Sequence, residues 1–169
     1  MPAEIDPREV ADVVELVNLV DIGNVVVYEE RARRVAWSEE ELADLEFPFT
    51  TNSLGMIADE HHLRYRFRSI FTDESAEYAA DVEIDYVSEQ AIGVTPEVQR
   101  EFAERVAFMA VYPFIRASIF GSASRLGMKA PVLGIVRQGE FALGDNLTEA
   151  ELQTAFGDVR SETVTERPT

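Results

Sequence analysis

The only two histidines, His61 and His62, are the first candidates for metal binding or acid–base catalysis, and they are adjacent in the chain. On an extended strand, neighbouring side chains point to opposite faces, so one metal ion cannot easily use both rings. The chain has no cysteine, which excludes disulfides and thiolate metal sites. It also lacks a glycine-rich phosphate loop and a Gly-x-Ser-x-Gly nucleophile motif. We therefore expect surface histidines in a protein that is not an enzyme and uses no cofactor.

The net charge further limits the classes of molecule that the protein is expected to bind. The chain carries 32 acidic and 15 basic residues, for a formal net charge of −17. Binding to nucleic acid or to an anionic membrane depends on basic surface, so the acid excess argues against both. The sequence shows no basic, apolar leader at its start and no apolar run of the roughly 18–20 residues that span a bilayer. These features favour a cytoplasmic protein that does not insert into membranes.

Three arginines nevertheless occupy alternate positions within residues 63–71, with apolar side chains between them. Residues 77–87 alternate in the same way, with acids on one face. If the two segments form an antiparallel hairpin in which Leu63 faces Tyr86 and Phe67 faces Val82, a single register matches both faces. That register predicts three ion pairs on a solvated sheet face: Arg64–Asp85, Arg66–Glu83 and Arg68–Asp81.

Local sequence signals predict the other helices and strands. Asp6-Pro7 predicts a helix start, and residues 19–35 predict a valine-rich strand with a bulge at Gly23-Asn24. Residues 38–46 are charged and predict a helical turn or a loop, with Trp37 beside them as a satellite-core residue or a partner contact. Residues 47–57 are interrupted by proline and glycine, which predicts an irregular crossover or an edge strand.

The C-terminal part is predicted to be helical. Thr95-Pro96 predicts the start of a long helix that continues to Gly127 and is kinked or divided at Pro113. Residues 130–136 are apolar and extended or looped. Thr148 and Glu151 form a capping-box pattern for a short helix over 149–156. We expect one domain over residues 1–157 and a disordered acidic tail over 158–169.

Residues 110–141 resemble the C-terminal helix region of the SecB family of export chaperones. The resemblance rests on an aromatic-Pro-aromatic segment followed by arginine, a helix that ends near a glycine, and a Pro-Leu stretch with a closing phenylalanine. The residues that carry it are Tyr112, Pro113, Phe114, Arg116, Ser124, Arg125, Gly127, Pro131, Leu133 and Phe141. The stretch between Arg125 and Phe141 is closer to divergent SecB-like proteins, some of which serve toxin–antitoxin systems.

The resemblance implies an α+β fold in which a four-stranded antiparallel sheet has a long kinked helix packed on one face. It also implies a homotetramer, a dimer of dimers, that acts as an ATP-independent holdase for unfolded or disordered clients in protein export or in the control of an antitoxin. In SecB the acidic outer sheet face docks the SecA motor. The corresponding partner-docking candidates here are Glu29, Asp81, Glu83 and Asp85, whereas Val25 and Ala79 stand where the family has an acid and a leucine.

A holdase needs exposed apolar side chains bordered by charge. Candidates lie in the aromatic crossover and in the helix after Pro113: Phe47, Phe49, Leu54, Met56, Ile57, Phe114, Ile115, Ile119 and Phe120. The same residues could instead fill the core or a subunit interface. Two other functions fit the pattern, namely a binder of a small or lipid-like molecule, and an acidic scaffold for a basic partner.

Overall fold

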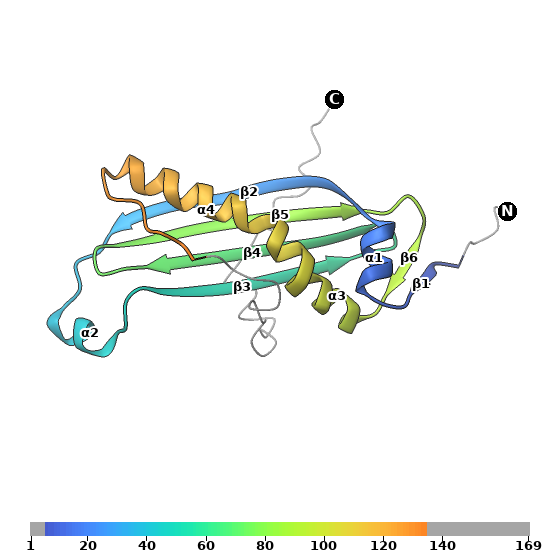
Figure 1. Ribbon diagram of the computed structural model, residues 1–169, viewed down its shortest axis with the longest axis horizontal. Helices are drawn as coiled ribbons and strands as arrows, with labels where there is room; N and C mark the ends of the chain where they lie inside the picture. Colours follow the sequence, from blue (N-terminus) through green and yellow to red (C-terminus); the bar gives the residue numbers. More distant parts are fainter. Residues whose placement is uncertain (1–5, 135–169) are drawn as a thin grey trace, which may run out of the picture.

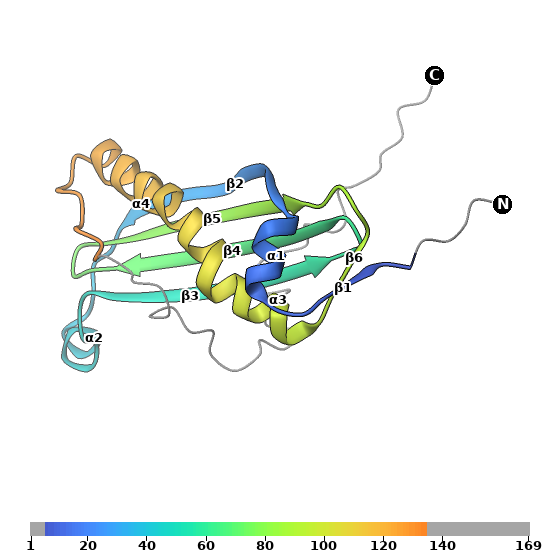
Figure 2. The same ribbon diagram turned by 45° about the vertical axis from the view of Figure 1, so that its right-hand side comes forward.

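A four-stranded antiparallel sheet with a long helical stretch across one face forms the body of the protein (Figure 1). The computed structural model describes residues 6–134. The strand order is β2 (Asp21–Arg34), β5 (Ala76–Val87), β4 (His62–Thr72) and β3 (Phe49–Ala58). Two views agree that the helices lie diagonally over the sheet (Figures 1 and 2). The predicted α+β architecture is confirmed.

The central hairpin has the predicted register. Leu63 pairs with Tyr86 and Phe67 pairs with Val82, as the two-sided alternation requires. On the helix-facing side, the aromatic and aliphatic side chains of both strands are buried, which removes large apolar surfaces from water. A slip of one residue would move this whole apolar set to the other face, so burial enforces the register.

The outer strands also match their predictions. β2 shows the expected irregularity between Ile22 and Asn24, and a second one between Val27 and Glu29. β3 lies at the opposite edge and pairs only with β4, as an edge strand does. Before β3, the short helix α2 (Glu39–Asp44) begins at a capping box made by Ser38 and Glu41 and extends beyond the end of the sheet (Figure 1).

The helix predicted to begin at Asp6-Pro7 is wrong. Residues Arg8–Val10 form β1, which pairs in parallel with β6 (Ile92–Val94). The helix α1 (Val13–Leu19) begins later, at Asp12, whose Oδ1 accepts a hydrogen bond of 2.8 Å from the Glu15 N–H. Asp12 is the stronger cap because the preceding backbone is held extended by β6, which no local signal reveals.

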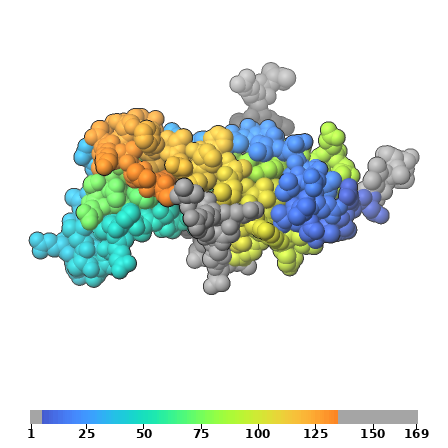
Figure 3. All heavy atoms as spheres, viewed as in Figure 1, coloured from blue at the N-terminus to red at the C-terminus, as the bar shows by residue number. Residues whose placement is uncertain are grey.

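The C-terminal helix is continuous in space and contains one wide turn. It comprises α3 (Pro96–Phe102), a π-helical turn (Ala103–Ala107) and α4 (Phe108–Arg125), with Thr95 capping its start as predicted. α4 runs through Pro113 without dividing, and the irregular turn lies upstream of it. The buried side chains of this helix meet the apolar sheet face, and its atoms cover the middle of that face in Figure 3.

The helical stretch Pro96–Arg125 is long and apolar enough to cross a membrane by length and composition alone. That property is weak evidence, because the core helix of a soluble protein has it too, and this helix packs its buried residues against the sheet. The predicted helix over 149–156, Phe141 and the tail over 158–169 lie outside the described residues.

Candidate functional site

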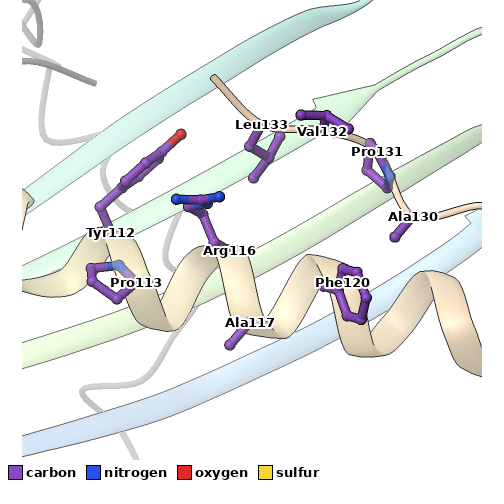
Figure 4. A pocket seen from close by; sticks show the side chains of 9 residues that line it. All are labelled: Tyr112, Pro113, Arg116, Ala117, Phe120, Ala130, Pro131, Val132 and Leu133. Atoms are coloured by element: carbon purple, nitrogen blue, oxygen red, sulfur yellow. The ribbon is translucent and has the colours of Figure 1, made fainter. Parts of the chain in front are cut away.

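An open groove runs along one side of α4, where the chain folds back after the helix ends (Figure 4). Its volume is about 450 Å³. Figure 4 shows the helix side chains and the returning segment facing each other across the groove. The lining residues are Tyr112, Pro113, Arg116, Ala117, Phe120, Ala130, Pro131, Val132 and Leu133.

A left-handed turn at Gly127 directs the chain back along the helix. Gly127 has a φ of 65°, which a residue with a β-carbon rarely adopts. The Gly127 N–H donates to the Ser124 carbonyl and the Met128 N–H donates to the Ala123 carbonyl, each at 3.0 Å, as in a Schellman motif. Farther along, the Tyr112 hydroxyl donates to the Gly134 carbonyl at 2.6 Å and holds the returning segment beside α4.

The groove suits apolar chain segments rather than bond-making chemistry. Phe120 is 61% exposed and Val132 is 90% exposed, so both present surface that a bound segment would cover. Arg116 is the one charged side chain in the lining, and its guanidinium lies 5.9 Å from the centre of the Tyr112 ring. Burial raises the pKa of Tyr112 and the nearby Arg116 partly offsets that rise, so the hydroxyl remains a hydrogen-bond donor near neutral pH.

The predicted client-binding residues of the helix separate into three environments. Phe120 lines the groove. Phe114 is 45% exposed but lies outside the groove lining. Ile115 and Ile119 are buried in the core against the sheet, and so is Leu54 of β3. These three buried residues offer no surface to a client in this structure.

The predicted crossover residues lie apart from the groove lining. Trp37, Phe47 and Phe49 form a chain of rings, with centroids 5.3 Å apart for the first pair and 5.6 Å for the second. Trp37 also donates from Nε1 to the Asp73 carbonyl at 3.2 Å, so it is tied to the body of the protein. Met56 and Ile57 are exposed on opposite faces of β3, since consecutive strand residues alternate.

Sequence reasoning missed most of the groove. It did not assign client contacts to Tyr112, Pro113, Arg116, Ala117 or the returning segment 130–133. The spacing of the helix residues, which repeats after four positions, places them on one side of a helix and could have identified that wall. The second wall depends on the chain reversal at Gly127, for which only the glycine itself was a signal.

On the outer face of the sheet, one of the three predicted ion pairs is present, Arg68–Asp81, and the other two are replaced by different partners. Arg66 does not pair with Glu83 directly opposite; its Nε and Nη2 reach Oδ1 and Oδ2 of Asp81, both at 2.8 Å. Arg68 lies 2.8 Å from Glu29 and 3.7 Å from Asp81. The Arg66 guanidinium also sits 4.0 Å from the centre of the Tyr28 ring. Long arginine side chains reach diagonal neighbours, and here the diagonal choice gives a two-point pair.

This face is therefore less acidic and less solvated than predicted. Asp81 is 1% exposed, and its hydrogen bond to Arg66 raises the pKa of that guanidinium. Asp85 lies 3.0 Å from Nδ1 of His62 rather than pairing with Arg64, and Glu83 accepts a hydrogen bond of 3.4 Å from the Tyr28 hydroxyl. Of the predicted docking acids, Asp81 is buried, and Glu29, Glu83 and Asp85 are half-buried.

The two histidines have different hydrogen-bond partners. His61 lies 3.0 Å from the Ser88 carbonyl through Nδ1, whereas His62 meets Asp85. Within residues 6–134, no group of three or more potential metal-ligating side chains comes together.

A four-stranded sheet under a long helix, with an apolar groove open beside that helix, defines an α+β protein of SecB-like architecture. No family model matches the chain. It is 32% identical over 140 residues to the SecB-like chaperone SmegB of Mycolicibacterium smegmatis, with 83% of this chain and 91% of that protein aligned. The chain belongs to the family of SecB-like chaperones.

A solved structure agrees on the fold. The Mycobacterium tuberculosis Rv1957 SecB-like chaperone, in complex with a ChAD peptide from the Rv1956 HigA1 antitoxin, superimposes with a TM-score of 0.60 at 14% identity. That match covers 73% of this chain and 92% of the Rv1957 chain. A Streptococcus agalactiae protein of unknown function matches with a TM-score of 0.48 at 8% identity, over 69% of this chain and 97% of that one, and supports no further argument.

Proposed function

We propose that this protein is a holdase that keeps unfolded or disordered client polypeptides soluble by binding their apolar segments in the groove beside α4. The observation that carries the proposal is the open groove with exposed Phe120 and Val132 on a SecB-like fold. Exposed apolar side chains on a rigid helix suit many different sequences, because contact with them needs no fixed hydrogen-bond partner. Binding of this kind needs no nucleotide and no cofactor.

An antitoxin is the client class that the comparisons favour. The Rv1957 chaperone, which shares this fold, was solved with a peptide from an antitoxin. A dedicated antitoxin chaperone would work in the cytoplasm, where toxin and antitoxin are made. Clients destined for export are the second class, and SecA is then the candidate docking partner.

SecA docking through the outer sheet face has weaker support. The acid at its centre, Asp81, is buried in a pair with Arg66, and Glu29 is paired with Arg68. A basic partner would meet a face on which arginines already neutralise these acids. For the same reason, the alternative function of an acidic scaffold that binds a basic partner has weaker support.

We propose further that the chain assembles as a dimer of dimers. Four exposed apolar residues lie on α1 and the first half of β2: Val14 at 72%, Val17 at 46%, Ile22 at 56% and Val27 at 45%. β2 is an edge strand, and pairing with another copy would satisfy its free backbone groups. Burial of this patch between subunits would leave the groove beside α4 free for clients.

The test is suppression of aggregation. A chemically denatured substrate diluted into buffer with the protein and without nucleotide should scatter less light as the chaperone concentration rises. Normal aggregation at several-fold molar excess would contradict the proposal. The groove is also large enough for part of a lipid-like molecule, so a ligand retained in native mass spectra, combined with no effect on aggregation, would establish that alternative instead.

A further inference from the structure

Acidic and basic residues are unevenly distributed along the chain, and the groove is built from a segment without acidic residues. The protein has a net charge of −17, yet residues 105–134 contain no aspartate or glutamate. The same stretch carries Arg105, Arg116, Arg125 and Lys129. Both walls of the groove come from this stretch, so the surface that lines the groove contains Arg116 and no carboxylate, although the protein is acidic.

Arg116 lies in the middle of that surface. Among the described residues, no carboxylate lies within the ion-pair distance of 4.0 Å from its guanidinium. Its guanidinium lies 5.9 Å from the centre of the Tyr112 ring, and Figure 4 shows its side chain directed toward the returning segment. By contrast, Arg105 pairs with Glu101, and Arg125 pairs with Glu30. Arg116 therefore presents its donors to whatever occupies the groove.

We propose that the groove selects extended client segments in which an aspartate or glutamate stands among apolar residues, and that Arg116 pairs with that carboxylate. The neighbouring apolar side chains of the client would lie on Phe120 and Val132. A guanidinium matches a carboxylate with two parallel hydrogen bonds, which adds orientation to an otherwise permissive apolar contact. This inference rests on the proposed client-binding function and specifies the client chemistry.

Long-range charge opposes the selection, so the contact itself must provide it. The acids elsewhere on the molecule repel an acidic peptide at low ionic strength. At about 0.15 M salt the screening length is about 8 Å, which weakens that repulsion more than a direct ion pair. The preference is therefore best measured at that salt concentration.

The experiment uses the full chain and three peptides of about ten residues, acetylated at the N-terminus and amidated at the C-terminus, that are apolar except for one central glutamate, glutamine or lysine. Fluorescence anisotropy should show the glutamate peptide binding about twofold to fivefold more tightly than the glutamine peptide. The lysine peptide should bind most weakly. Arg116→Gln should remove the preference and Arg116→Lys should retain part of it. Arg105→Gln removes an arginine outside the groove lining and should leave the preference unchanged.

Chemical cross-linking can show where the carboxylate of the bound peptide lies. Lys129 is the only lysine in the chain, and it directly precedes the groove residue Ala130. Carbodiimide coupling of the glutamate peptide should therefore yield an amide at Lys129, and Lys129→Arg should abolish that product. Coupling only at the N-terminal amine would overturn the inference.

The outcomes separate the two proposals. Equal binding of the glutamate and glutamine peptides, or a preference that survives Arg116→Gln, overturns the charge selection and leaves the holdase proposal standing. Failure of all three peptides to bind, together with normal aggregation of the denatured substrate, overturns both.

Discussion

Arg66 and Asp81 form a two-point ion pair across the central hairpin, with both nitrogen–oxygen distances at 2.8 Å. They are diagonal neighbours in the register rather than directly opposed. The side chain of Asp81 is 1% exposed and that of Arg66 is 13% exposed, so the pair is largely removed from water. Because the pair is largely removed from water, leaving either charge without its partner would be costly.

Breaking this pair should destabilise the fold. Arg66→Met leaves Asp81 buried without its main partner, and we expect the free energy of unfolding to fall by about 3 kcal/mol. That is the lower end of the range for buried pairs, because Arg68 remains 3.7 Å away. The double variant Arg66→Met/Asp81→Leu should lose less stability than Arg66→Met alone.

Urea denaturation measures the free energy of unfolding of both variants, with Arg64→Met as the exposed control on the same strand. A loss for Arg64→Met equal to that for Arg66→Met would contradict the assignment.

Phe120 should be essential for client binding. Phe120→Asp places a charge on the groove wall but leaves the core intact, since the side chain is 61% exposed. We expect about a tenfold higher chaperone concentration for half-maximal suppression of aggregation, with an unchanged thermal midpoint. Phe114→Asp makes the same change on the same helix outside the lining and should retain activity. Equal losses in the two variants would show that the groove is not the binding surface.

Gly127 should determine the geometry of the groove through its backbone. Gly127→Ala forces a β-carbon into a φ of 65°, which costs about 1 kcal/mol of stability and displaces the returning segment. Within residues 6–134, no atom apart from chain neighbours and the helix's own backbone lies within 4 Å of the added carbon at Gly127 or at Gly121, so neither variant meets a clash. Gly121→Ala lies within α4 and should therefore stabilise by about 0.5–1 kcal/mol. Thermal unfolding and peptide affinity of the two variants test this prediction. A stabilising Gly127→Ala would refute the role of Gly127 in shaping the groove.

The exposed apolar patch on α1 and β2 should mediate assembly. Ile22→Glu/Val27→Glu introduces charges that a subunit interface could not bury, so light scattering should show a mass below four chains. Leu42→Glu on α2, where the leucine is 45% exposed, should leave the mass unchanged. A wild-type protein that runs as a monomer would remove the basis for this prediction.

Alkaline pH should destabilise the protein through its buried tyrosines. Burial raises the pKa of Tyr86 from 10.0 to about 12 and raises the pKa of Tyr65 as well. Because the folded state keeps the proton while the unfolded state releases it, stability is complete below pH 10 and falls as the pH rises from about 10 toward 12. Both hydroxyls are buried and have no hydrogen-bond partner within the described part of the chain. Tyr86→Phe should therefore be tolerated at pH 8 and should reduce the alkaline loss, as urea midpoints across this range would show. An unchanged alkaline loss in Tyr86→Phe would assign it to other groups.

The order of the main elements and the register of the hairpin could be predicted from the sequence. In residues 63–71 and 77–87, one face is apolar and the other is charged, and a single alignment satisfies both. The cap at Thr95 and the edge position of residues 49–58 follow from similarly local signals. The first helix was misplaced because a strand partner about 80 residues later keeps Arg8–Val10 extended.

The candidate site depended more on tertiary structure. Nine apolar residues were predicted to bind clients, but hydrophobicity alone does not separate the buried Ile115 and Ile119 from the exposed Phe120. Phe120 became a groove residue because the chain turns back at Gly127 and Tyr112 holds the returning segment. On the outer face, the sequence alone determined which strands bring arginines and acids together. Only the folded sheet decided that Arg66 pairs with Asp81, because side-chain reach, burial and the Tyr28 ring select one partner from several at similar separation.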